Sequence, residues 1–273
     1  MTNNELRNKA KYIRIQCIDI ITKIRSGHPG ASLSLVDVLV VLYYNHMQID
    51  VKNPNWTDRD RFVLSKGHGC IPLYVMLADM GFFDKKELFT IREINSILQG
   101  HPDRNKTPGV DASTGSLGMG ISIAVGMALQ ARMEKKDYYI YALLGDGELN
   151  EGQVWEAAMA AAHYHLDHLI CVIDNNGSQV DGINSEVMNT EPIAQKWRAF
   201  NWDVCEINGH DYFEINETFN RIKNVNNAKP HMIIAHTIKG KGVKSIEGGL
   251  EIYGEKFTEE MGRKFRNEVI QGD

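Results

Sequence analysis

Apolar residues recur at three- and four-residue steps over residues 6–24, and this spacing predicts an amphipathic helix. The helix is expected to end at SGHPG, because Gly27 and Pro29 disfavour its continuation. Similar spacing predicts further helices near residues 35–47, 71–80, 85–98, 121–135 and 212–225, with others starting near 153 and 258.

Short apolar runs alternate with these helices and are predicted to be buried strands. The runs are RFVLS, YYIYALL, LICVID, WDVCEI and HMIIAHT. Strands that alternate with helices form βαβ units, so residues 1–273 are expected to be one α/β domain: a parallel sheet with helices on both faces. A Gly- and Lys-rich stretch at 239–256 is expected to be a mobile loop, followed by a C-terminal helix.

Composition and charge narrow the classes of function. With 43% hydrophobic and 24% charged residues, the chain has the composition of a soluble globular protein. The net charge is −5 and the basic residues are dispersed, which argues against a nucleic-acid or membrane partner. The polar N-terminus and four cysteines without C-x-x-C spacing are typical of a cytoplasmic protein with reduced thiols.

Several loops carry candidate chemistry. The segment QGHPDRNKTPGVDASTGSLGMG has no periodicity, and loops of this length usually have a function. His28 in SGHPG, His68 in KGHG and His101 in QGHPD each lie in a loop bounded by glycine or proline, where functional residues concentrate. Any single histidine is more often structural than catalytic, so these three are candidates only as members of a larger site.

Two predicted strands end in side chains that offer oxygen atoms, Asp146 of GDG and Asn176 of NN. The two residues lie 30 positions apart, about one βαβ unit, so both are expected at the same edge of the sheet. Carboxylate and amide oxygens suit Mg²⁺, while Gly145 and Gly147 let phosphate approach the main chain. Each motif alone is also typical of a simple turn, but their spacing favours a site for a metal-bound diphosphate.

GDG, followed about 27 residues later by NN, resembles the thiamine diphosphate motif. The surrounding SGHPG, RDRFVLSKGHG, QGHPD, STGSLGMGISIAVGMA and NTEPIAQKWRAF resemble transketolases, in particular the N-terminal subunit of split transketolases. The likeness spans about residues 13–254. It implies a thiamine diphosphate-binding fold and transfer of a two-carbon ketol unit from a ketose phosphate to an aldose phosphate. The implied cofactors are thiamine diphosphate and Mg²⁺, for which Ca²⁺ or Mn²⁺ can substitute.

The resemblance also assigns roles to residues near the two strand ends. It implies that the metal is held by Asp146, Asn176 and the main-chain carbonyl of Ser178. Neutral imidazoles and glycine amides suit phosphate oxygens, which agrees with cofactor roles for residues of these types. The implied cofactor contacts are His68, Gly115, Ser116, Leu117, Asp146, Gly147, Asn176 and Tyr253.

Catalytic and partner roles follow from the same resemblance. His28 and His101 match histidines that contact substrate hydroxyls and move protons, and Glu151 matches a residue of a proton relay at the subunit contact. Single-chain transketolases also carry a pyrimidine-binding domain that is not found in this sequence. The chain is therefore expected to be inactive alone and to act on sugar phosphates with a separate C-terminal transketolase subunit, most simply as an α₂β₂ assembly.

One departure from the family bears on the substrate. Tyr253 in EIYG stands where transketolases usually have a histidine, and tyrosine does not readily change protonation at neutral pH. We therefore expect a substrate other than the usual pentose phosphates, or a lower rate. The sequence does not identify the two sugars, the partner chain or the pathway.

Two other functions stay open at this point. One is a related enzyme, either an E1 α-type subunit of a 2-oxo acid dehydrogenase or a ketol transferase of a specialised pathway. The other is a non-enzymatic subunit that serves only assembly. The histidines of SGHPG and QGHPD favour a sugar enzyme, and the presence of both Asp146 and Asn176 argues against a purely structural subunit.

Overall fold

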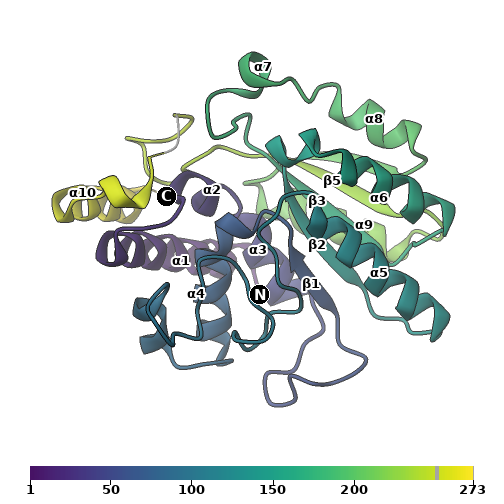
Figure 1. Cartoon of the computed structure of the whole chain (residues 1–273), viewed down its shortest axis with the longest axis horizontal. Helices are drawn as coiled ribbons and strands as arrows, with labels where there is room; N and C mark the ends of the chain where they lie inside the picture. Colours follow the sequence, from purple (N-terminus) through teal and green to yellow (C-terminus); the bar gives the residue numbers. More distant parts are fainter. Residues whose placement is uncertain (250–251, 273) are drawn as a thin grey trace.

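Five parallel strands form the centre of the computed structural model, which describes residues 1–249 and 252–272 (Figure 1). The strand order is β1-β2-β3-β5-β4, and all neighbouring pairs are parallel. Gly145 pairs with Asp174 and Asn175 pairs with His236, so the carboxyl ends of the central strands lie at one edge. The strands are β1 (Arg61–Leu64), β2 (Ile140–Gly145), β3 (Leu169–Asn175), β4 (Asp203–Asn208) and β5 (His231–His236).

Successive side chains of each strand point to opposite faces of the sheet, and each face packs against its own helices (Figure 1). Leu143 and Val172 belong to one core, and Leu144 and Ile173 to the other. The predicted parallel sheet with helices on both faces is therefore confirmed. The first core includes α1 (Asn3–Ile24), α3 (Val36–Val41), α4 (Cys70–Met80) and α9 (Tyr212–Asn224); the second includes α5 (Met119–Met133), α6 (Gly152–His163) and α8 (Ile193–Ala199).

The two ends of the chain lie together, because α1 packs against α10 (Glu259–Gln271) (Figure 1). The predicted C-terminal helix is confirmed, and the Thr258 side chain caps it by accepting a hydrogen bond from the Met261 N–H at 3.1 Å. No helix among the described residues is long and apolar enough to cross a membrane. The shorter helices are α2 (Pro29–Ser34), η1 (Leu42–His46), η2 (Gly67–Gly69), η3 (Lys85–Thr90), η4 (Gly147–Asn150), α7 (Asn184–Val187) and η5 (Gly254–Lys256).

Two predicted helices differ from the structure. The helix expected over residues 85–98 is only the short η3, because the chain turns at Arg92 and Asn95, whose φ angles are 69° and 68°. The helix expected over 35–47 is divided into α3 and the π-helical turn η1. Residues 239–249 form successive turns, residues 250 and 251 lie outside the described residues, and the mobility of this loop stays a prediction.

Candidate functional site

Asp146 and Asn176 follow neighbouring strands, and the structure brings them to the same edge of the sheet, as predicted. The Asp146 carboxylate accepts hydrogen bonds from the main-chain N–H groups of Gly147 at 2.7 Å and Gly177 at 2.6 Å. The Asn176 amide oxygen accepts one from the Ser178 N–H at 3.2 Å. The loop after β3 is therefore tied directly to the loop after β2.

A cavity of about 310 Å³ opens beside these two loops. Three residues that the sequence analysis did not identify, Lys66, Glu148 and Lys239, also line it. Eight of the predicted site residues come together here, although they originate from five separate segments of the chain. These eight are His28, His68, Leu117, Asp146, Gly147, Glu151, Asn176 and Ser178.

The oxygen atoms around Asp146 fit a hard divalent cation. Asp146 is only 2% exposed, and burial followed by the nearby Asp174 carboxylate raises its pKa to about 6. The Asn176 amide and the Ser178 carbonyl are further hard oxygen donors at the same cavity. In the described part of the chain, no three His, Cys, Asp or Glu side chains gather as a metal-binding group. A cation here would therefore need the amide, the carbonyl and oxygens from a bound phosphate to complete its shell.

Lys66 and Asp174 form a buried ion pair at the cavity, with Nζ 2.5 Å from Oδ2 and each side chain 1% exposed. Asp174 also accepts hydrogen bonds from Ser34 at 2.6 Å, from the Asn176 amide nitrogen at 3.2 Å and from the Thr237 hydroxyl. Burial raises the pKa of Asp174, but Lys66 and these hydrogen bonds outweigh burial and lower it. The ionised Asp174 holds the nitrogen of Asn176, which fixes the direction of the amide oxygen.

Glu148 is a second buried acid that the sequence analysis missed. One of its oxygens accepts hydrogen bonds from the Gly118 N–H at 2.8 Å and from the Ser65 hydroxyl, and the other accepts from the Gly145 N–H at 3.1 Å. Ser65 follows β1, Gly145 ends β2 and Gly118 precedes α5. Glu148 therefore connects two strand ends to the loop 114–118.

The predicted cofactor residues Gly115, Ser116 and Leu117 all lie in the loop 114–118, but only Leu117 lines the cavity. Gly115 lies against the ring of His101, since a Cβ atom at this glycine would lie 3.3 Å from His101 Cγ. Ser116 is exposed in the same loop. The structure therefore brings Gly115 and His101 together, at a position next to the cavity lining.

Three aromatic rings contact one another at the cavity, those of His68, His28 and Tyr253. His28 lies edge-on to both His68 and Tyr253, and the centroids of the two histidine rings are 5.1 Å apart. Burial, followed by the charges of Lys66, His28 and His101, lowers the pKa of His68 to about 3. Near pH 7 the His68 ring is therefore neutral, with one nitrogen able to donate and the other able to accept a hydrogen bond.

His101 and Glu151 have more open surroundings. Burial and then the Arg92 guanidinium lower the pKa of His101, so this imidazole also favours its neutral form. Glu151 is exposed at the rim of the cavity, where it precedes α6 as its N-cap residue. The exposed position leaves the Glu151 carboxylate accessible from solvent.

The remaining wall of the cavity is shaped by Gly147, Gln179 and Lys239. A Cβ atom at Gly147 would lie 2.9 Å from Gln179 Cγ, so glycine at this position keeps the wall open. Lys239 is 4% exposed, and its ammonium donates a hydrogen bond to the Gln179 carbonyl at 3.4 Å. Lys239 brings positive charge to a cavity that also offers hard oxygen donors, whereas the charge of Lys66 is balanced by Asp174. This combination can hold an anion such as a diphosphate with its metal ion.

Comparison with known proteins agrees with this geometry. The family described as transketolase, thiamine diphosphate binding domain, matches residues 6–269. The chain is 46% identical to the 6-deoxy-6-sulfo-D-fructose transketolase subunit of Clostridium sp. (strain MSTE9), over 94% of this chain and 93% of that protein. It is also 46% identical to an apulose-4-phosphate transketolase subunit of Phocaeicola vulgatus, over 86% of this chain and 83% of that protein.

Full-length transketolases match over less than half of their own length. Human transketolase is 37% identical over 97% of this chain, but the match covers 42% of the human protein. The crystal structure of Campylobacter jejuni transketolase superposes with a TM-score of 0.90 at 35% identity, over 98% of this chain and 43% of that chain. The chain therefore belongs to the transketolase family, with the thiamine diphosphate-binding α/β fold.

Proposed function

We propose that this chain is the cofactor-binding subunit of a transketolase that transfers a two-carbon ketol unit between sugars, using thiamine diphosphate and Mg²⁺. The observation that carries the proposal is the position of Asp146 and Asn176. They follow adjacent parallel strands and line one cavity with the buried Lys66 and Lys239. Hard oxygen donors beside the ammonium of Lys239 suit a metal-bound diphosphate.

In this proposal the chain holds the phosphate end of the cofactor. Asp146, the Asn176 amide oxygen and the Ser178 carbonyl bind the metal ion, while Gly147 leaves room for the diphosphate. Lys239, whose ammonium contacts the Gln179 carbonyl, adds a positive charge. When bound, thiamine diphosphate supplies the carbon nucleophile of ketol transfer. The work of the protein is to position the cofactor and the sugar and to move protons.

The histidines and Glu151 carry the proton and substrate roles. A neutral imidazole can accept a proton at one nitrogen and release one from the other, which suits His28 and His101 as partners for sugar hydroxyls. His68, which burial keeps neutral, donates or accepts a hydrogen bond at the cofactor. Glu151 lies exposed at the cavity rim, where a second subunit can reach it.

A separate partner chain is part of the proposal. Two relatives that are named as subunits match this chain over 93% and 83% of their length, whereas human transketolase is matched over 42%. This difference in length supports a C-terminal, pyrimidine-binding subunit that completes the site. The simplest assembly is an α₂β₂ heterotetramer.

The substrate is expected to be a specialised anionic sugar. The two subunit relatives are named for 6-deoxy-6-sulfo-D-fructose and apulose 4-phosphate, each a sugar with an anionic group. Tyr253, which stands where transketolases usually have a histidine, lies against His28 in this chain. These two observations support a donor other than the common pentose phosphates.

The proposal is tested by reconstitution with Mg²⁺ and thiamine diphosphate. Ketol transfer is measured with this chain alone, with a C-terminal transketolase subunit of the same organism alone, and with the two combined. We expect turnover only in the combined sample. Turnover by this chain alone would contradict the two-subunit proposal. Oxidative decarboxylation of pyruvate by the combined sample, without ketol transfer, would assign the chain to the 2-oxo acid dehydrogenases.

A further inference from the structure

The segment 237–241, called here the exit segment, leaves β5 and carries Lys239 into the wall of the cavity. Its first residue, Thr237, donates its hydroxyl hydrogen bond to Asp174. Further along, the Gly240 N–H donates to the Gly30 carbonyl at 3.1 Å. The position of the Lys239 ammonium therefore depends on how the main chain is held between these two points.

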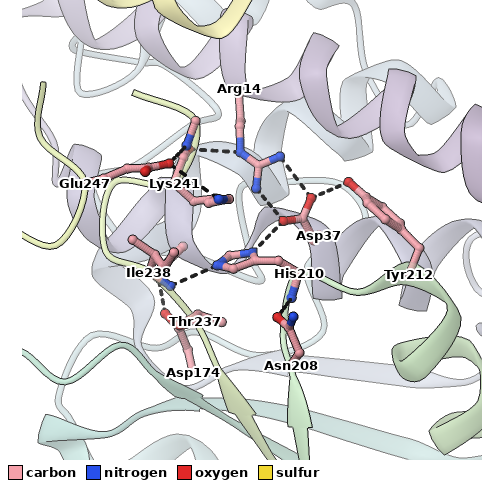
Figure 2. A network of polar contacts seen from close by, with 12 residues as sticks. Arg14, Asp37, Asp174, Asn208, His210, Tyr212, Thr237, Ile238, Lys241 and Glu247 are labelled. Atoms are coloured by element: carbon pink, nitrogen blue, oxygen red, sulfur yellow. Dashed lines mark hydrogen bonds and ion pairs between the residues drawn. The ribbon is translucent and has the colours of Figure 1, made fainter. Parts of the chain in front are cut away.

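His210 holds the exit segment at Ile238. Figure 2 shows the His210 ring between Asp37 on one side and Ile238 on the other. The Ile238 N–H donates to His210 Nε2 at 2.9 Å, and His210 Nδ1 lies 2.7 Å from Asp37 Oδ2. A main-chain N–H can only donate, so Nε2 must carry no proton and Nδ1 must carry one.

Asp37 fixes that tautomer. Arg14 donates two hydrogen bonds to the Asp37 carboxylate, at 2.9 and 2.6 Å, and the Tyr212 hydroxyl donates another. Burial raises the pKa of Asp37, but Arg14 and the hydrogen bond with His210 outweigh it and hold the pKa well below its usual range. The ionised Asp37 accepts hydrogen bonds only, so the His210 nitrogen that faces it must be the donor.

The same network reaches the far end of the exit segment. Arg14 Nε donates to the Lys241 carbonyl at 3.0 Å, so one guanidinium binds both Asp37 and the segment (Figure 2). Ile238 and Lys241 are thus held on either side of Lys239 by groups that all connect to Asp37. None of these groups lines the cavity itself, apart from Lys239.

We propose that His210 is a positioning residue: oriented by Asp37, it fixes the main chain at Ile238 and thereby places Lys239 for contact with the cofactor diphosphate. This inference rests on the proposed function, since it assumes a diphosphate in the cavity. It adds a residue of the turn between β4 and α9 that no motif indicated. His210 acts through Lys239, so its loss should matter only while the lysine ammonium is present.

Two substitutions test the two hydrogen bonds of the His210 ring one at a time. In His210→Asn the amide nitrogen can still donate to Asp37, but nothing reaches the Ile238 N–H. In His210→Gln the amide oxygen can accept from Ile238. Titration of Mg²⁺-thiamine diphosphate into the chain reconstituted with its C-terminal partner subunit should give about fivefold weaker binding for His210→Asn, the effect of one hydrogen bond. His210→Gln should restore most of the affinity, and His163→Asn, on the exposed end of α6, serves as the control.

A double-mutant cycle tests whether the effect passes through Lys239. In a Lys239→Met background, His210→Asn should cause no further loss of cofactor affinity. Hydrogen exchange of the Ile238 amide should become at least about tenfold faster in His210→Asn than in His210→Gln.

The inference would be overturned if His210→Asn weakened cofactor binding equally in the wild-type and the Lys239→Met backgrounds. It would also be overturned if His210→Asn and His210→Gln bound the cofactor equally weakly. Failure of the wild-type chain to bind Mg²⁺-thiamine diphosphate in the presence of its partner subunit would instead contradict the proposed function. The Ile238 exchange rate would then still decide whether His210 holds the exit segment.

Discussion

The ring of Tyr253 lies edge-on against the ring of His28, with the centroids 5.3 Å apart and the planes inclined by 72°. His28 makes the same kind of contact with His68, so the three rings form a row beside the cavity. Tyr253 thus occupies the end of a row of proton-carrying groups, but it cannot itself exchange a proton readily near pH 7. This arrangement makes Tyr253 a candidate determinant of substrate choice.

Replacement of Tyr253 by histidine should move the enzyme toward the common transketolase substrates. In the reconstituted enzyme, kcat/KM for xylulose 5-phosphate with ribose 5-phosphate should rise about fivefold, the effect expected of one added hydrogen bond. Tyr253→Phe, which keeps the ring and loses the hydroxyl, is the matched control and should not show this gain. An unchanged kcat/KM in the histidine variant would remove the basis for assigning substrate choice to Tyr253.

Removal of the charge of Lys66 should destabilise the fold as well as the site. Lys66→Met leaves the buried Asp174 carboxylate without its cation, and loss of one partner of a buried ion pair typically costs about 3 kcal/mol or more. Urea unfolding of the chain measures the free energy of unfolding. Lys86→Met is the control, because its pair with Asp84 is 76% and 58% exposed and should contribute little to stability. Equal, small effects of both substitutions would show that Lys66 and Asp174 are not a coupled buried pair.

Glu148→Gln should loosen the loop 114–118. The amide offers only one acceptor oxygen where the carboxylate accepts from Gly118, Ser65 and Gly145, so one buried N–H loses its partner. The expected cost is about 1–3 kcal/mol of unfolding free energy, with faster hydrogen exchange at Gly118 or at Gly145, whichever amide faces the new NH₂ group. Glu156→Gln, at an exposed position of α6, controls for the loss of a negative charge. Unchanged exchange at both Gly118 and Gly145 in Glu148→Gln would mean that Glu148 does not connect β2 to this loop.

The low pKa of His68 predicts a pH dependence of stability. The pKa of this ring is about 3 in the folded chain against an ordinary value of 6.5, so the unfolded state binds more protons between these values. The free energy of unfolding should therefore fall as pH decreases below about 6.5. Between pH 7 and 5, the decrease in the free energy of unfolding should be smaller in His68→Gln than in the wild type by up to about 2 kcal/mol. Urea unfolding at both pH values measures this difference. His163→Gln controls for the removal of a histidine as such, and equal losses in wild type and His68→Gln would contradict the burial of a neutral ring.

The sequence was sufficient to predict the fold class and the convergence of Asp146 with Asn176. Both follow from one local pattern, because apolar runs separated by a helix form parallel strands whose carboxyl ends share an edge. The residues that hold the site in place carry no such pattern. Asp174 is bound by Lys66, Ser34 and Thr237, which come from three distant segments of the chain.

The sequence analysis did not identify Glu148 and predicted too long a helix at η3, for two further reasons. Glu148 follows a glycine turn and resembles an ordinary surface acid, and the approach of the distant Ser65 and Gly118 explains why it is buried. The predicted helix over 85–98 is wrong beyond Thr90, because Arg92 and Asn95 take left-handed backbone angles that no local pattern indicated. In both cases the tertiary surroundings, and not the local sequence, decide the structure.

The central claim is that Asp146 and Asn176 hold the metal-bound diphosphate of thiamine diphosphate. Calorimetric titration of the chain reconstituted with its C-terminal partner subunit tests it most directly, with thiamine diphosphate and thiamine compared in Mg²⁺ and in EDTA. We predict saturable binding of thiamine diphosphate that requires Mg²⁺, little binding of thiamine, and at least about tenfold weaker binding by Asp146→Asn. Asp137→Asn, at an exposed position before β2, should bind like wild type. Equal binding of thiamine and thiamine diphosphate, or unchanged affinity in Asp146→Asn, would contradict the account.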